Sequence, residues 1–168
     1  MSYQQVAAYE IRNIIWRELT GYGLLDITNY YADGFSDPLV PIIPAQQIPE
    51  FNNNLPGKTY IVYDISVKTI PVQWWMFEET MTLDVVSKDP DEIQVIINFL
   101  IDLFRRYDLS ASEINLLHGD IVFNYHYFKI DSADPVQAFQ HEGGFMNGTI
   151  AISYGYSREV DSTTGKYL

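Results

Sequence analysis

Three histidines and a few neighbouring carboxylates are the residues of this 168-residue chain whose types could support catalysis or metal binding. His118, His126 and His141 lie far apart in the sequence and lack the paired spacing of metal ligands. His126 falls within an expected strand, where a hydrogen-bonded structural role is more common than a ligand role. The chain has no cysteine, which excludes disulfides, thiol catalysis and cysteine-bound zinc.

Glu78 and Glu79 are adjacent carboxylates that invite comparison with a general acid–base pair. They fall in an expected strand, where neighbouring side chains point to opposite faces, so they cannot act on one substrate atom. Asp89, Asp91 and Glu92 also cluster, but capping of the following helix accounts for them. The sequence contains neither a phosphate-binding loop nor a Gly-x-Ser-x-Gly elbow. We therefore predict a protein that is not an enzyme and has no cofactor or metal. A buried, pKa-shifted carboxylate or histidine in a closed pocket would reverse that prediction.

The charge balance is strongly acidic, because 22 Asp and Glu against 10 Lys and Arg give a net charge of −12. The bases are scattered, and only Arg105 and Arg106 are adjacent. A protein that grips nucleic acid needs several cations on one face, so this function is disfavoured, as is binding to an anionic membrane. Solubility is the simplest explanation of the acidity.

The sequence pattern indicates no membrane-spanning or secretory segment. The longest apolar run, Ile93–Phe104, is interrupted by Gln94, Asn98 and Asp102, and it is shorter than the roughly 20 residues that cross a bilayer. The first residues, Met1–Gln5, have neither the basic region nor the apolar region of a signal peptide.

The first half of the chain predicts a helix followed by a long irregular segment. Ser2 is a suitable N-cap for a helix that ends at Gly21. Between Ala32 and Lys58, five prolines, three consecutive asparagines and two glycines predict a long loop with little regular structure. Its segment Leu39–Pro44 is too apolar for a free linker, so we expect it to lie against another surface.

The second half predicts two strand pairs on either side of a helix. Alternating apolar and polar residues indicate strands over Tyr60–Ile70 and Trp74–Val86. Asp89 as N-cap and proline at the first helical position begin a helix over Pro90–Tyr107. Further strands are expected over Ile121–Ile130 and Gly144–Tyr156, with a polar loop between them.

This order of elements predicts an α+β fold, in which a mainly antiparallel sheet has two main helices packed on one face. We expect a single domain over residues 1–156, with the proline-rich loop at 32–58. Residues 157–168 are expected to form a flexible C-terminal tail.

Two apolar features exceed what one sheet needs to bury. The helix over Pro90–Tyr107 is apolar over more than half its circumference, so Val95, Phe99 and Leu103 can pack on the first helix or contact a neighbouring subunit. Trp74 and Trp75 are adjacent in a strand, so one ring points away from the core. That ring either covers the outer face of its own hairpin or anchors an interface.

The layout resembles that of the tail terminator, or tail-completion, proteins of tailed bacteriophages. The shared features are an N-terminal helix, a proline-rich loop, an aromatic strand, an acidic and threonine-rich strand, an amphipathic helix and a late strand pair. Here the aromatic strand begins with Tyr60-Ile-Val-Tyr, the acidic strand is Glu78–Val86, and the last strand is Gly148–Tyr156. The resemblance spans most of residues 1–156 and is one of layout and residue type.

This resemblance implies a structural virion protein that forms a homohexameric ring at the head-proximal end of the tail. The ring is assembled in the host cytoplasm, caps the tail tube protein and joins it to the head-tail connector or neck. Its partners could also include a tail sheath, and DNA passes through without specific binding. Other phage neck, head-completion and sheath-capping proteins stay open as alternatives. A small monomeric ligand- or peptide-binding module also stays open.

The ring hypothesis also predicts where charge and order are found. An acidic channel lets DNA slide through, because like charges give no bound state. Candidate channel residues on loops and solvent-facing strand positions are Asp33, Asp37, Glu78, Asp131 and Asp134. The segment Leu39–Pro56 is expected to be poorly ordered in an isolated subunit and to become ordered against a neighbour.

Overall fold

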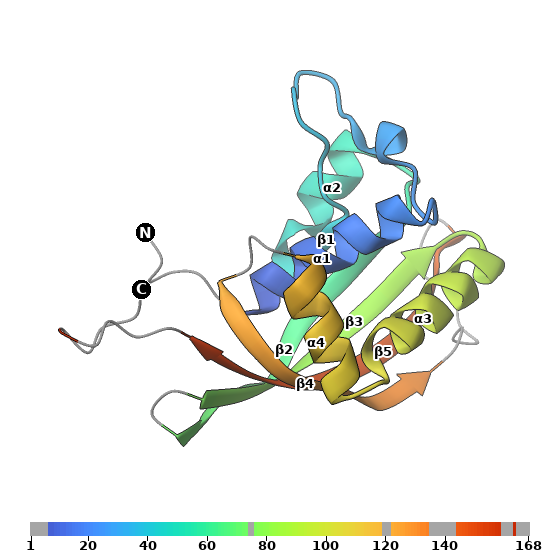
Figure 1. The fold of residues 1–168 in the computed structure, drawn as a ribbon. Coiled ribbons are helices and arrows are strands. Elements are labelled where there is room, and N and C mark those ends of the chain that lie inside the picture. Colours follow the sequence, from blue (N-terminus) through green and yellow to red (C-terminus); the bar gives the residue numbers. More distant parts are fainter. Residues whose placement is uncertain (1–6, 74–75, 119–121, 135–143, 159–162, 164–168) are drawn as a thin grey trace.

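The centre of the fold is a five-stranded sheet with the strand order β1-β2-β3-β5-β4 (Figure 1). The computed structural model describes residues 7–73, 76–118, 122–134, 144–158 and 163. The strands are β1 (Ile42–Pro44), β2 (Tyr60–Gln73), β3 (Met76–Ser87), β4 (Phe123–Asp134) and β5 (Met146–Arg158). The main helices are α1 (Ala7–Gly21), α2 (Ile48–Asn54), α3 (Pro90–Phe104) and α4 (Asp108–Leu117), with short 3₁₀ turns at Ile27–Tyr30 and Ala45–Gln47. Every strand pair is antiparallel except the short parallel pair of β1 and β2.

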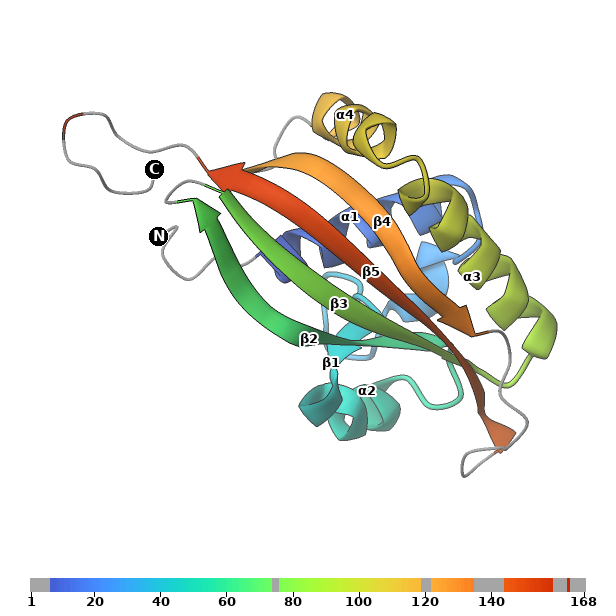
Figure 2. The same ribbon diagram turned by 90° about the horizontal axis from the view of Figure 1, so that it is seen from below.

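One face of the sheet carries the core. The alternation along β2, β3 and β5 places Ile61, Leu83 and Ile150 on this face, and all three are fully buried. Helices α1, α3 and α4 cover it, while the opposite face carries no helix over β3 and β5 (Figure 2). The prediction of an α+β fold with its main helices on one face is confirmed. Within the described ranges, none of the helices is both long and apolar enough to span a bilayer.

Helix α3 begins where the sequence predicts and ends earlier. The Asp89 carboxylate accepts a hydrogen bond from the Asp91 amide at 2.9 Å, and Pro90 occupies the first turn. The helix was expected to continue to Tyr107 but ends at Phe104, because Tyr107 has a φ of 54° that no helix accommodates. The ring of Tyr107 stacks on Tyr127 with centroids 5.0 Å apart, which holds this turn. Helix α4, which was not predicted, follows it directly.

The proline-rich segment is more regular than its composition suggests. Residues 42–44 form β1, with Ile42 aligned to Ile61 of β2, and residues 48–54 form α2. Ile42, Ile43 and Phe51 are buried in the core. The expected loop therefore contains a short strand and a helix, because an apolar segment without helical or strand periodicity still buries its side chains through a short parallel strand. The expected disorder of Leu39–Pro56 in an isolated subunit stays a prediction. Its expected contact with another surface is made within the subunit.

Both strands of the last pair end later than predicted, and β5 also begins two residues later. Strand β4 runs to Asp134, so residues 131–134 are strand rather than the beginning of a loop. Strand β5 runs to Arg158, two residues into the expected tail. The long antiparallel pairing of β4 with β5 supports these extensions. Of residues 159–168, only 163 is among those described.

Candidate interaction surfaces

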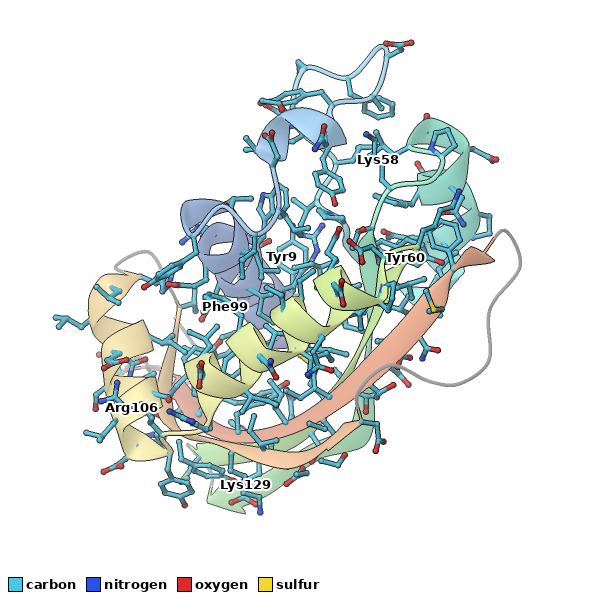
Figure 3. The ribbon with its side chains drawn as sticks, turned by 90° about the vertical axis from the view of Figure 1, so that its right-hand side faces the viewer. Tyr9, Lys58, Tyr60, Phe99, Arg106 and Lys129 are labelled. Atoms are coloured by element: carbon cyan, nitrogen blue, oxygen red, sulfur yellow. The ribbon has the colours of Figure 1, made fainter. Side chains whose placement is uncertain are left out.

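The outer flank of α3, where the sequence predicts an interface, is divided between core and solvent. Phe99 packs on Tyr22 at the end of α1, with ring centroids 5.3 Å apart. Leu103 is half-buried, whereas Val95 is 49% exposed. Phe99 lies between α3 and α1 in Figure 3. The flank thus contacts α1 in part and leaves apolar surface uncovered. Trp74 and Trp75, the other predicted interface residues, lie outside the described residues.

A cleft of about 340 Å³ with a mixed lining lies beside this flank, between the end of α1, α3 and α4. The apolar part of its lining is Tyr22, Phe99, Leu103, Ile114 and Leu117, and the polar part is Glu18, Asp102, Ser110 and Glu113. Three leucines of α4 extend the apolar surface outward: Leu109 is 54%, Leu116 81% and Leu117 69% exposed. Exposed apolar side chains that gather on one part of a surface often mark interaction sites. We name the cleft together with these leucines the α3–α4 surface.

Polar groups border the α3–α4 surface as ion pairs. Arg106 contacts Glu113 at 2.6 Å, and Arg105 contacts Asp102 at 3.3 Å. Both pairs are about half exposed or more, so each contributes at most about 1 kcal/mol to stability. Deeper in, His118 Nε2 lies 2.9 Å from a carboxylate oxygen of Glu18. An apolar centre with a polar rim is the usual anatomy of a protein–protein interface.

The helix-free face of the sheet is acidic and rich in hydroxyl groups. Glu79 points into the core, so its neighbour Glu78 points to this face, as the strand alternation predicts. The carboxylates on this face are Asp64, Glu78, Asp84, Asp131 and Asp134. Thr149 Oγ1 donates to Asp84, and Ser153 Oγ donates to Asp131. Lys129 is a base on this face, and its Nζ lies 3.8 Å from an Asp131 carboxylate oxygen.

The predicted channel residues do not all fall on this face. Glu78, Asp131 and Asp134 share it, on two different strands. Asp33 and Asp37 are exposed in the segment that leads into β1, away from it. The structure therefore brings three of the five residues onto one surface. The sequence analysis missed Asp64 and Asp84, although both occupy the polar phase of alternating strands.

Tyr127 lies on the helix-free face, and its ring leaves no room for a side chain at Gly155. A Cβ atom on Gly155 would lie 2.5 Å from Cε1 and 3.0 Å from Cδ1 of this ring. Burial, and then a hydrogen bond to Glu78, raises the pKa of the Tyr127 hydroxyl. The stacked Tyr107 ring fixes the other side of Tyr127. The ring therefore has little freedom to move aside.

Gly155→Ala is expected to lower the free energy of unfolding by about 1–3 kcal/mol, because the added methyl group overpacks a fixed ring. Chemical denaturation measures this loss. Gly21→Ala is the matched control, since no atom lies within 4 Å of the corresponding Cβ position and alanine favours the end of α1. Equal stabilities for both variants would show that the Tyr127 ring moves freely.

Two buried carboxylates tie tyrosines into the core. Glu10 accepts hydrogen bonds from the Val122 amide at 2.7 Å and the Tyr125 hydroxyl at 2.9 Å. Glu79 accepts from the Tyr154 and Tyr156 hydroxyls at 2.8 and 2.9 Å. Neither carboxylate lines the cleft of the α3–α4 surface or the two further hollows described below. Both carboxylates accept hydrogen bonds from buried donors, so Glu10 joins α1 to β4 and Glu79 joins β3 to β5.

The same network makes stability depend on pH at the alkaline end. Burial, followed by the nearby charges of Glu10 and Glu79, raises the pKa values of Tyr125 and Tyr154 above the ordinary value of 10.0. Because the folded-state pKa values are raised, their stabilising effect is complete below pH 10 and is lost as the pH rises above it. We expect part of the tyrosinate absorbance to appear only on unfolding, and that part to be smaller in Tyr125→Phe and Tyr154→Phe. A titration of all tyrosines before unfolding would contradict this.

A larger hollow of about 690 Å³ lies at the β1 end of the sheet, on the face opposite α1 and α3, where α2 forms one of its walls. Apolar residues of α2, β2 and β3 form most of it, with Phe145 at one wall. The Oδ1 atom of Asn52, which lines it, is buried and has no hydrogen-bond partner among the described residues. Lys88 covers Phe145, with its Nζ 5.2 Å from the ring centroid.

Neither the models of known protein families nor the curated proteins include a match to this chain. The function is therefore argued from the surfaces themselves. The α3–α4 surface can bury apolar area against a partner. The helix-free face can repel a polyanion.

Proposed function

We propose that this chain is a structural subunit of a phage tail, a terminator that assembles into a homohexameric ring. The ring caps the tail tube at the head-proximal end of the virion and joins it to the neck or connector. The observation that carries the proposal is the α3–α4 surface, where Leu116 and Leu117 are largely exposed beside the cleft. Association with a second subunit would remove this apolar surface from water.

The acidic helix-free face gives the proposed ring a second property. Three of the candidate channel residues share this face with two further carboxylates. If this face lines the channel, DNA passes without binding, since binding needs cations that displace the counterions of phosphate. This role needs no metal, cofactor or catalytic residue. A neck, head-completion or sheath-capping ring would use the same two surfaces.

Phe99→Asp is expected to yield folded monomers, because it places a charge in the cleft of the α3–α4 surface. Asn98→Asp is the matched control, since Asn98 is the exposed neighbour of Phe99 and lies on the polar strip of the same helix. Light scattering coupled to size exclusion measures the mass, and circular dichroism measures the fold. The control is expected to assemble like the wild type.

An assembled Phe99→Asp variant would contradict the role of this flank. If the variant unfolds, Val95→Asp replaces it in the same comparison. Val95 is half exposed, so its replacement leaves the core intact. Assembly of that variant at wild-type strength would refute the proposed contact.

A second candidate function is a monomeric binding module, which the 690 Å³ hollow and its unpartnered Asn52 oxygen favour. Such a module would bind an apolar ligand or peptide that donates a hydrogen bond to Asn52. This candidate would be favoured if the chain stays monomeric and if a hydrophobic dye fluoresces less with the Val62→Lys variant than with the wild type. An assembled wild type would favour the ring.

A further inference from the structure

The two edges of the sheet carry different elements. Helix α4 lies along β4 at one edge, and α2 lies beside β1 at the other (Figure 2). A head-to-tail ring needs two unlike patches on opposite sides of each subunit, because every subunit donates one and accepts with the other. The sheet order thus provides the two positions that such patches would occupy.

At the β4 edge, the carboxyl end of α4 exposes the side chains of Leu116 and Leu117, which we name the knob. Leu116 is 81% exposed, the highest value among the large apolar side chains described, and Leu117 is 69% exposed. The last turn of α4 contains no Lys or Arg. The carbonyl end of the helix dipole therefore places a partial negative charge beside the two leucines.

At the β1 edge, a hollow of about 260 Å³ has an apolar floor. Ile43 and Phe51 are buried beneath it, and Leu39 and Val40 are partly exposed at its wall. The rest of the lining is Arg12, Gln47 and Glu50. We name this the β1 hollow.

Arg12 is the cation of the β1 hollow, whose lining also includes the carboxylate of Glu50, and it can complement the end of α4. Its Nε donates to the Ile42 carbonyl at 2.6 Å, and its Nη1 donates to Asn13 at 3.0 Å. The guanidinium lies 5.0 Å from the centroid of the Tyr9 ring. Within the described part of the chain, it forms no ion pair with a carboxylate. A fixed cation of this kind interacts favourably with the carbonyl end of a helix.

We propose that the carboxyl end of α4, with Leu116 and Leu117, docks in the β1 hollow of a second copy of this chain. This inference rests on the proposed ring and names the surface that receives the α3–α4 surface. The leucine side chains then contact the apolar floor of the hollow, and the helix carbonyls approach Arg12 at its polar side. Because knob and hollow lie at opposite edges of one sheet, the contact repeats from subunit to subunit until the ring closes.

Leu116→Asp and Val40→Asp each remove one side of the proposed contact. Both are expected to give folded monomers of 19.4 kDa. The matched controls, Asn98→Asp and Gln46→Glu, add the same charge at exposed positions outside the knob and the hollow. They are expected to assemble like the wild type. Native mass spectrometry measures all four masses.

Mixing the two monomeric variants tests the pairing directly. Leu116→Asp keeps an intact hollow, and Val40→Asp keeps an intact knob, so one productive contact remains between them. An equimolar mixture is expected to form dimers of two 19.4 kDa chains and nothing larger. A double variant that carries both Val40→Asp and Leu116→Lys places opposite charges on the two sides of every contact. This variant is expected to form the ring again.

The outcomes separate this inference from the proposed function. Rings formed by either single variant would overturn the pairing while leaving the ring proposal intact. A mixture and a double-charge variant that both stay monomeric would also overturn it. A wild type that never assembles would instead contradict the proposed function itself.

Discussion

Glu10→Ala is expected to lower the free energy of unfolding by about 3–5 kcal/mol, because it leaves three donors in the core without their acceptor. The Glu10 carboxylate is buried and accepts hydrogen bonds from the amides of Val122 and Phe123 and from the Tyr125 hydroxyl. Each of these donors, if left without an acceptor in the core, costs about 1–3 kcal/mol. Because Glu10 lies on α1 and the donors at the beginning of β4, its loss also weakens the attachment of α1 to the sheet.

Chemical denaturation of the purified chain measures this loss. Glu113→Ala is the matched control, because its carboxylate pairs with Arg106 at the surface, where both side chains are about half exposed. The control is expected to change the free energy of unfolding by at most about 1 kcal/mol. A Glu10→Ala loss as small as that of the control would mean that water reaches the three donors.

Asp131→Lys with Asp134→Lys is expected to make the assembled protein bind duplex DNA. The two positions lie on the helix-free face, which the account assigns to the channel. Binding by about 6–10 phosphate contacts would weaken by ~10³-fold or more between about 50 and 200 mM salt, because bound counterions are released. The wild type is expected not to bind under either condition.

Asp33→Lys with Asp37→Lys is the control that separates position from charge. It changes the net charge by the same four units, but both residues lie in the segment before β1, away from the helix-free face. Fluorescence anisotropy with a labelled duplex, measured on assembled protein, compares the two variants. Equal binding by both would contradict the assignment of the helix-free face to the channel, and the acidity would then reflect solubility.

Local sequence signals predicted the strands and α3 well. Asp89 and Pro90 mark the beginning of α3 through capping chemistry that needs no tertiary contact. The alternation around Glu78 and Glu79 correctly placed these neighbours on opposite faces of β3. Parts that depend on distant contacts were missed. Strand β1 has three residues and exists only because β2 pairs with it.

Helix α4 and the knob show the same limit. The segment Asp108–Leu117 begins after Tyr107, whose unusual backbone depends on the ring of Tyr127 in β4. The apolar arc on α3 left open whether its flank packs on α1 or contacts a neighbouring subunit, and in the structure Phe99 contacts Tyr22 while Val95 is exposed. The β1 hollow could not be predicted, because Arg12, Val40 and Phe51 meet only after α1, β1 and α2 have packed together.

The most direct test of the ring is the mass of the wild-type chain by native mass spectrometry, across a range of concentrations. The chain is measured alone and with tail tube subunits. The account predicts a closed assembly, and six chains of 19.4 kDa would give a mass of about 116 kDa. A chain that remains at 19.4 kDa under every condition, including with tube subunits present, would contradict it.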